Sequence, residues 1–215
     1  MSAEHASIAA TQAPACWSCG RALESGAAFC GACNSVQPPG QMDHFARLGL
    51  QRGYTVDLAA LDRAYFGLQR RLHPDRFARK PPRERAISQQ QAAALNEAYE
   101  TLKNPIRRAR YLAEQMGVDL PGDGRTIDDP ELLMEAMEAR EALAEAGSAA
   151  EVQVLEQKSR DERAGAIEAL SALFAQADHA GIRRAILRLA YLDKFVEEAR
   201  ARRLNLGSAL SLIHI

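Results

Sequence analysis

Apolar residues recur at spacings of three and four along most of the chain, which is the period of a helix with one buried face. In residues 57–73, the apolar positions that share one helical face are Leu58, Leu61, Tyr65, Leu68 and Leu72. Asp57 precedes this run and can cap the start of the helix. A second pattern runs from about Arg83 to Lys103, and its expected buried positions are Ile87, Leu95, Ala98, Tyr99 and Leu102. We therefore expect an antiparallel pair of helices joined by a short loop.

Three longer helical patterns follow, at roughly residues 130–146, 149–178 and 181–204. The first begins with Asp129-Pro130, a capping residue followed by a proline at the first helical position. No run of alternating β-branched residues is long enough to predict a strand. The sequence therefore predicts an all-α fold, with a helical hairpin and a C-terminal three-helix bundle behind a small cysteine-containing knuckle.

The chain is expected to have a disordered start, a four-cysteine knuckle, two helical domains and a tail. The expected bounds are residues 1–15, 16–38, 43–117, 118–206 and 207–215. Pro38-Pro39-Gly40 is a linker signal, so we expect the knuckle and the hairpin to have separate cores. The tail turns apolar directly after a charged helix. We interpret it as non-native sequence rather than as a segment that docks on the bundle, and leave it out of the fold prediction.

Composition is typical of a soluble globular protein, with 47% hydrophobic and 26% charged residues. No apolar stretch approaches the length of a membrane span. The first residues lack the basic residues of a secretory or transit signal, so we expect a cytoplasmic protein without membrane contact. The net charge of −1 conceals a basic excess in residues 43–117 and an acidic excess in residues 118–215. This split indicates either two partner surfaces or ordinary solvated helix faces.

The cysteines form two Cys-x-x-Cys pairs, and they are Cys16, Cys19, Cys30 and Cys33. Each pair lets two thiolates converge from one turn, and Gly20 and Gly31 are expected to let the backbone curl around a metal. Two such turns supply the four sulfurs of a structural, tetrahedral zinc ion. Iron can use the same ligands, whereas disulfides need an oxidising compartment and a redox pair normally belongs to a larger α/β domain. The knuckle has a single arginine and no lysine, so we expect no nucleic-acid binding.

His73-Pro74-Asp75 lies between the two hairpin helices. Pro74 disfavours helical backbone at His73 and so ends the first helix. The tripeptide by itself also fits an ordinary turn in which Asp75 caps the next element. Its place after a helix with a basic face favours a binding loop. The basic residues of that helix that lie off the apolar stripe are Arg63, Arg70 and Arg71.

The helix expected at residues 130–146 has a complete packing stripe, formed by Leu132, Ala136, Ala139 and Leu143. A second apolar patch with acidic neighbours lies away from this stripe, and its members are Leu133, Met134, Met137, Glu138, Glu141 and Glu145. A one-sided surface helix does not need this second patch. The helix is therefore either buried on two sides or exposes a partner-binding patch with an apolar centre and an acidic rim.

Several stretches resemble the HscB family of J-domain co-chaperones. MDHFARLGL, the helix ending RRLHPDRF, and LNEAYETLKNPIRRARYL are similar to the family's J domain. CWSCG, FCGAC and QPP resemble the extra zinc knuckle that some members carry. LLMEAMEAREALAEA and LRLAYLDKF resemble the C-terminal helical domain. The resemblance covers about residues 16–205.

The resemblance implies a non-enzymatic adaptor for iron–sulfur cluster assembly. One end would dock on a DnaK/HscA-type chaperone and stimulate its ATPase, through His73, Pro74, Asp75, Arg63, Arg70, Arg71 and Arg76. The other end would bind an IscU-type scaffold protein, through Leu133, Met134, Met137, Glu138, Glu141, Glu145 and Tyr191. A general J-domain co-chaperone, with the cysteines as a zinc module for unfolded clients, is the alternative.

Overall fold

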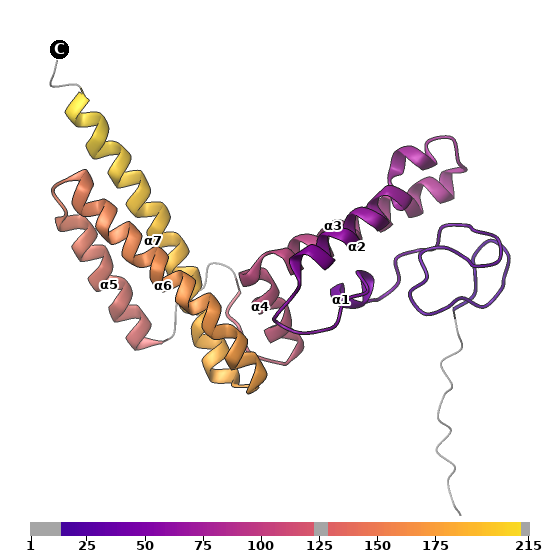
Figure 1. Cartoon of the computed structure of the whole chain (residues 1–215), viewed down its shortest axis with the longest axis horizontal. Coiled ribbons are helices and arrows are strands. Elements are labelled where there is room, and N and C mark those ends of the chain that lie inside the picture. The colour runs from indigo at the N-terminus through magenta and orange to yellow at the C-terminus, as the bar shows by residue number, and fades with distance from the viewer. Residues whose placement is uncertain (1–13, 123–128, 212–215) are drawn as a thin grey trace, which may run out of the picture. The chain divides into compact units, whose positions relative to one another are not determined.

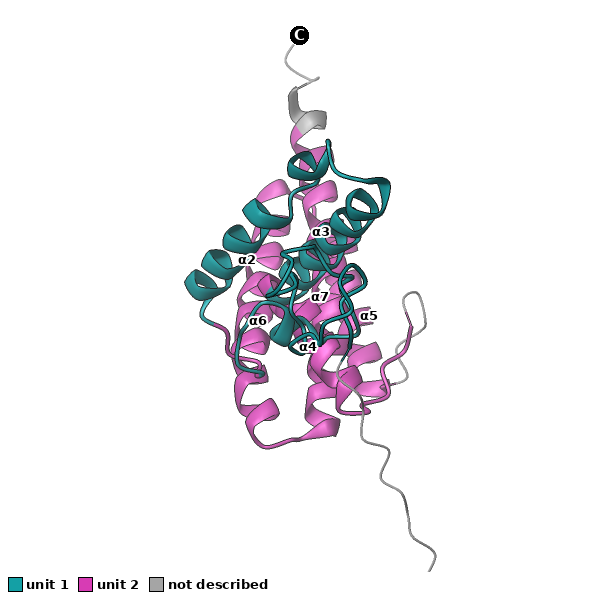
Figure 2. Cartoon of the chain, turned by 90° about the vertical axis from the view of Figure 1, so that its right-hand side faces the viewer, with its two compact units in different colours: residues 1–52, 57–102 teal, residues 53–56, 103–215 magenta. Residues whose placement is uncertain are grey.

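The computed structural model describes residues 14–122 and 129–211, and these are almost entirely helical (Figure 1). In this part of the chain the only β-structure is a pair of isolated bridges in the cysteine region, so the expected all-α fold is confirmed. None of its helices is both long and apolar enough to cross a bilayer. The chain divides into two compact units (Figure 2), which are Met1–Arg52 with Asp57–Leu102 and Gly53–Val56 with Lys103–Ile215.

The first unit contains the predicted hairpin. Its elements are α1 (His44–Arg47), α2 (Leu58–Leu72), the short 3-10 helix η1 (Pro74–Phe77) and most of α3 (Pro82–Lys103). The Asp57 carboxylate accepts hydrogen bonds from the N–H groups of Ala59 and Ala60, as expected for a cap. At the other end of α2, the Ser88 hydroxyl donates to the Leu72 carbonyl at 2.8 Å. Side chains therefore form hydrogen bonds with backbone groups at both ends of α2.

The hairpin core agrees with the sequence pattern except at two positions of α2, which are Leu68, only partly buried, and Leu58. The expected α3 residues Ile87, Leu95, Ala98, Tyr99 and Leu102 are buried, as are Leu61, Tyr65 and Leu72 of α2. The rings of Tyr65 and Tyr99 stack with centroids 3.9 Å apart. Leu58 is an exception, because 49% of it is exposed. It is the first residue of α2, and helical side chains point back towards the N-terminus, so its side chain extends beyond the helix end.

The knuckle packs on this hairpin within the same unit, which differs from the expectation of two separate cores. Gln37 is 2% exposed, and its carbonyl oxygen accepts a hydrogen bond of 2.7 Å from Nε2 of Gln91 in α3. Pro39 and Gly40 contribute too, since their carbonyl oxygens accept hydrogen bonds from the Arg47 guanidinium. Pro38-Pro39-Gly40 is thus part of a packed surface, because the residues on either side of it are anchored to helices.

The second unit contains four helices, which are α4 (Pro105–Gln115), α5 (Pro130–Glu145), α6 (Ala149–Ala175) and α7 (His179–Ser211). The helices α5 and α6 agree with the expected spans to within three residues, whereas α7 continues to Ser211, beyond the expected end at residue 204. Asn104, Asp129 and Ser148 cap α4, α5 and α6 by accepting hydrogen bonds from N–H groups of the first turn. The predicted cap at Asp129 is therefore confirmed.

The helices α5, α6 and α7 share one apolar core, whose buried members include Ala136, Leu143, Val152, Leu192, Phe195 and Ala199. Leu132 is also fully buried and Ala139 partly so, so the predicted packing stripe of α5 is confirmed. Two charged residues are buried in the described part of this unit, Arg108 of α4 and Glu156 of α6, and Glu156 is 4% exposed. Its carboxylate accepts hydrogen bonds from the guanidinium groups of Arg160 and Arg203, which offsets the cost of burying the charge.

The helix α4 belongs to the second unit rather than to the hairpin. Tyr54 shows why, since its ring stacks on Phe174 and lies under the Arg108 guanidinium at 5.0 Å from the ring centroid. The expected boundary between residues 117 and 118 stays a prediction. Residues 1–13 and 212–215 lie outside the described part, so the disordered start and the non-native tail also stay predictions. The helix α7 ends at Ser211, inside the segment that we left out of the fold prediction.

Candidate functional site

The two Cys-x-x-Cys turns have the same backbone geometry. Cys16 donates its N–H to the Arg21 carbonyl at 2.8 Å, and Cys30 donates to the Ser35 carbonyl at 3.0 Å. An isolated β-bridge encloses each turn, Ala15 with Ala22 and Phe29 with Val36. The two loops therefore present their sulfurs in matching ways, as a four-ligand site from two loops requires.

A left-handed residue follows the second cysteine of each pair. Gly20 takes this place in the first turn with a φ of 73°, as expected for glycine. In the second turn the place is taken by Asn34, with a φ of 57°. Gly31 lies between the two cysteines of its pair and is not among the residues with positive φ. Asparagine tolerates the left-handed region better than most residues.

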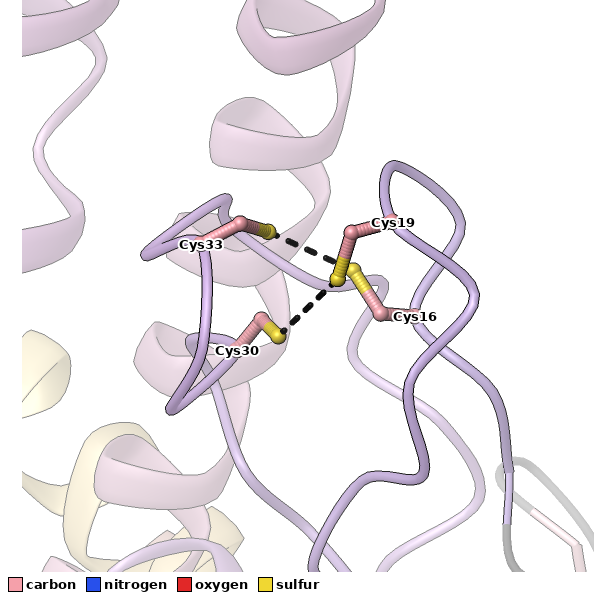
Figure 3. Close-up of side chains that lie close together, drawn as sticks. All are labelled: Cys16, Cys19, Cys30 and Cys33. Atoms are coloured by element: carbon pink, nitrogen blue, oxygen red, sulfur yellow. Dashed lines mark hydrogen bonds between the residues drawn. The ribbon is translucent and has the colours of Figure 1, made fainter.

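The four sulfurs converge between the loops (Figure 3). Their Sγ atoms all lie within 4.8 Å of one another, and the Cys16–Cys33 and Cys19–Cys30 pairs are each 3.7 Å apart. Sulfurs about 2.3 Å from a tetrahedral zinc ion are about 3.8 Å from one another. All four cysteines are free thiols. Their arrangement therefore fits a tetrahedral metal ion.

Hydrogen bonds around the sulfurs favour thiolates at two positions. Hydrogen bonds with the Ser35 hydroxyl and backbone lower the pKa of the Cys33 thiol to about 6. Burial raises the pKa of the Cys16 thiol, but hydrogen bonds from the backbone N–H groups of Cys19 and Ser18 outweigh this and lower it. Metal-bound cysteines are thiolates, and N–H donors around a site orient its ligands. The surroundings of these two sulfurs thus suit metal binding.

The His-Pro-Asp tripeptide forms an exposed loop at the end of α2. His73 ends α2 and also caps η1, because its Nδ1 accepts a hydrogen bond of 3.3 Å from the Asp75 N–H. The same Nδ1 lies 3.5 Å from the Asp75 carboxylate, whose side chain is 90% exposed. Phe77 is buried and anchors the far end of η1. The loop therefore presents a carboxylate to solvent on a short, anchored support.

The four predicted basic residues do not share one environment. Arg63 is exposed on α2, with its guanidinium 3.9 Å from the Asp57 carboxylate. Arg70 and Arg76 are exposed beside the loop, and an Arg76 N–H donates to the Arg70 carbonyl at 3.5 Å. Arg71 differs, because its guanidinium lies 4.8 Å from the centroid of the Phe29 ring in the knuckle. Arg70 and Arg76 thus lie beside the loop, Arg63 lies near the N-terminal end of α2, and Arg71 contacts the cysteine region.

The apolar patch on α5 is exposed, which agrees with the interpretation as an exposed patch and not with a helix buried on two sides. Leu133, Met134 and Met137 are exposed to 42%, 62% and 63%. The acidic residues of the patch, Glu138, Glu141 and Glu145, are exposed as well. Helix α5 is therefore buried on one side only, and its second apolar face is available to a partner. Whether these side chains bind a scaffold stays a prediction.

Tyr191 is buried, unlike this exposed set, although it lines a surface pocket together with Glu138. It is 7% exposed, belongs to the core shared by α5, α6 and α7, and donates its hydroxyl to the Glu135 carbonyl at 3.4 Å. Its ring lies beside that of Phe195, with centroids 6.4 Å apart. The structure thus gives Tyr191 a packing role, and its predicted role as a scaffold contact is carried by the resemblance alone.

Four residues that join the knuckle to the hairpin were not among the sequence candidates, and they are Trp17, Phe29, Gln37 and Gln91. Trp17 lies inside the first cysteine pair and is the one tryptophan of the chain, which is the only signal that singles it out. The others follow no motif or period. Their contacts join segments distant in sequence, so a local pattern could not have found them.

Comparison with known proteins identifies the two helical domains of the chain. A DnaJ domain model matches residues 43–111, and the model of the HSCB C-terminal oligomerisation domain matches residues 128–200. The mouse iron-sulfur cluster co-chaperone protein HscB is 32% identical over 192 residues, which cover 87% of this chain and 82% of the mouse protein. A co-chaperone protein HscB homolog of Azoarcus sp. is 40% identical over 165 residues, covering 74% of this chain and 92% of that protein.

Two solved structures extend the similarity to the fold. Human co-chaperone protein HscB superposes with a TM-score of 0.82 at 30% identity, covering 90% of this chain and all of that one. Chaperone HscB from Vibrio cholerae gives 0.66 at 32% identity, over 77% of this chain and 99% of that one. Most of the chain thus shares its fold with these proteins. The chain belongs to the HscB family of co-chaperones.

Proposed function

We propose that this protein brings an IscU-type iron–sulfur scaffold protein to a DnaK/HscA-type chaperone and stimulates the chaperone's ATPase. The observation that carries the proposal is the presence of two separate exposed surfaces. One is the His73-Pro74-Asp75 loop with its basic neighbours, and the other is the apolar patch of α5 with its acidic rim. The protein acts by holding two partners close together, so its own residues make and break no covalent bond.

At the first surface, Asp75 provides the contact with the chaperone. Its carboxylate is almost fully exposed, so it can accept charge-assisted hydrogen bonds from an arginine of the partner without a large desolvation cost. Pro74 restricts the backbone, and His73 orders the loop through its hydrogen bond to the Asp75 N–H. Arg63, Arg70 and Arg76 steer the loop towards an acidic surface.

At the second surface, the scaffold contacts the exposed side chains of α5. The centre is Leu133, Met134 and Met137, and Glu138, Glu141 and Glu145 form the rim. Methionine side chains adapt to an irregular partner surface because they are unbranched and flexible. The acidic rim repels acidic proteins and attracts basic ones. The two domains are thus assigned as a J domain at residues 43–117 and a scaffold-binding domain at residues 118–206.

The knuckle residues Cys16, Cys19, Cys30 and Cys33 hold a structural Zn²⁺ in this proposal. The ion would link the two loops in a region with few apolar residues, where a metal can supply most of the folding free energy. All four ligands come from the protein, so no position is left open for catalysis. Iron is the less favoured occupant of the same sulfurs.

The direct test is the ATPase rate of a purified DnaK/HscA-type chaperone with the parent protein and with Asp75→Asn. The parent should raise the rate, and the variant should not, because the amide lacks the charge that an arginine partner requires. Its circular dichroism should be unchanged, since an exposed side chain contributes little to stability. Equal stimulation by both proteins would remove the J-domain assignment. Stimulation that increases with an unfolded client but not with the scaffold would favour the general co-chaperone.

A further inference from the structure

Two aromatic rings of the knuckle lie against two arginines at the ends of the hairpin helices. The Phe29 ring centroid is 4.8 Å from the Arg71 guanidinium carbon, and the Trp17 ring centroid is 4.4 Å from that of Arg83. Arg71 belongs to the last turn of α2 and Arg83 to the first turn of α3. The chain between these two arginines is the segment that carries the His-Pro-Asp loop. The knuckle therefore holds both ends of this loop segment.

Hydrogen bonds connect the same contact to the cysteines. Nε2 of Gln37 donates to Cys16 Sγ at 3.3 Å, while the Gln37 carbonyl accepts from Gln91 of α3 at 2.7 Å. Both glutamines are almost completely buried. Trp17 is fixed in a similar way, because its Nε1–H donates to the Val36 carbonyl at 2.6 Å. A folded knuckle thus orients both the ring of Trp17 and the backbone that contacts α3.

We propose that Trp17 and Phe29 are positioning residues for the His-Pro-Asp loop, so that the knuckle braces the part of the J domain that contacts the chaperone. This inference rests on the proposed function of the loop. It also changes the role of Arg71, which acts through the Phe29 ring instead of reaching the chaperone directly. The ordered knuckle reduces the number of open conformations of the segment between Arg71 and Arg83.

The size of the effect follows from the two ring contacts. A cation–π pair at a partly exposed site shifts an equilibrium by a factor of about 2 to 5. Loss of both pairs should therefore raise the open population of the loop segment by about 4- to 25-fold. Amide hydrogen exchange measures such local opening directly, and it needs no chaperone.

The first experiment compares amide exchange in the metal-loaded full-length parent and in Trp17→Leu/Phe29→Leu, which keeps apolar side chains but removes the ring faces. Exchange in residues 70–88 should become about 4- to 25-fold faster, while α6 is unchanged. Phe29→Tyr with Trp17 unchanged keeps both ring faces and the Trp17 hydrogen bond to the Val36 carbonyl, so it should exchange like the parent. Unchanged exchange in the leucine variant with its metal retained would overturn the proposal. If that variant loses its metal, Arg71→Gln/Arg83→Gln provides the test, because it leaves the knuckle intact. Amide exchange in residues 70–88 should then be accelerated by the same factor.

The second experiment is a double-mutant cycle of ATPase stimulation with Phe29→Leu, Arg71→Gln and the combined variant. If Arg71 acts through the ring, each single change lowers stimulation and the combined variant is no worse than Arg71→Gln. Full stimulation by Phe29→Leu together with a loss in Arg71→Gln would mean that Arg71 touches the chaperone itself, and would overturn the inference. Failure of the proposed function looks different, since the parent and Asp75→Asn would then behave alike while the exchange result still stands.

Discussion

Truncating Leu133 and Met137 to alanine tests whether these side chains of α5 bind a partner or pack in the core. Both side chains are exposed, to 42% and 63%, while the packing stripe of the helix is complete without them. Their loss should therefore weaken scaffold binding and leave folding nearly unchanged. The chaperone-stimulating surface contains neither residue, so basal ATPase stimulation should be preserved.

The magnitude can be worked from these exposed fractions. Burying a fully exposed leucine or methionine side chain is worth about 1.5–3 kcal/mol. In proportion to the exposure of Leu133 and Met137, an interface that covers both gains about 1.5–3 kcal/mol in total. The double variant should therefore bind the scaffold about 10- to 100-fold more weakly. Its free energy of unfolding should change by less than about 1 kcal/mol, since mostly exposed side chains contribute little to the core.

The assay is calorimetric titration with an IscU-type scaffold, run beside a thermal melt of the same sample. Val154→Ala is the matched control, because Val154 is 68% exposed on α6 and should change neither readout. Leu132→Ala is the opposite control: it is fully buried, so it should cost about 2–5 kcal/mol of stability. Unchanged scaffold binding with a melting temperature as low as that of Leu132→Ala would show that packing has been mistaken for recognition.

Three further predictions concern metal, charge and the buried ion pair. Elemental analysis after anaerobic purification should find a single zinc ion per chain; metal-free protein with titratable thiols would contradict the knuckle assignment. Changing Glu138, Glu141 and Glu145 to glutamine should weaken scaffold binding at low salt and much less at high salt, where exposed charges are screened; titration at two salt concentrations tests this, and equal losses would argue against an electrostatic rim. Glu156→Gln should lower the free energy of unfolding by about 1–3 kcal/mol, because Arg160 and Arg203 lose a buried carboxylate; an unchanged denaturant midpoint would refute this.

Local signals in the sequence were sufficient for the long helices and for several of their starts. Asp57 and Asp129 cap helices in the structure as predicted, because capping depends on residues only two or three positions away. The face of each helix was predicted equally well, since Leu132 and Leu143 are buried and Met137 is exposed. Within each Cys-x-x-Cys pair the convergence of two sulfurs is also a local property, because it needs only one turn, whereas the meeting of the two pairs joins residues 11 and 17 positions apart.

Contacts between distant segments could not be predicted in this way. Gln37 and Gln91 are separated by most of the hairpin, and no period or motif links them. The same holds for Tyr191, whose burial depends on how α7 packs against α5. Leu58 fits the apolar period of α2 but is exposed. Periodicity predicts which face of a helix is apolar, but it does not predict how far along that face the neighbouring helix extends. Tertiary packing decides each of these cases.

The measurement that tests the central claim most directly is a complementation experiment between two defective chains. Asp75→Asn lacks the chaperone contact, and Leu133→Ala/Met137→Ala lacks the scaffold contact. The readout is the scaffold-dependent increase in the chaperone's ATPase rate at low scaffold concentration. If one chain must hold both partners together, the parent gives the increase and an equimolar mixture of the two variants does not. Full recovery by the mixture would show that the two surfaces act independently, and would contradict the adaptor mechanism.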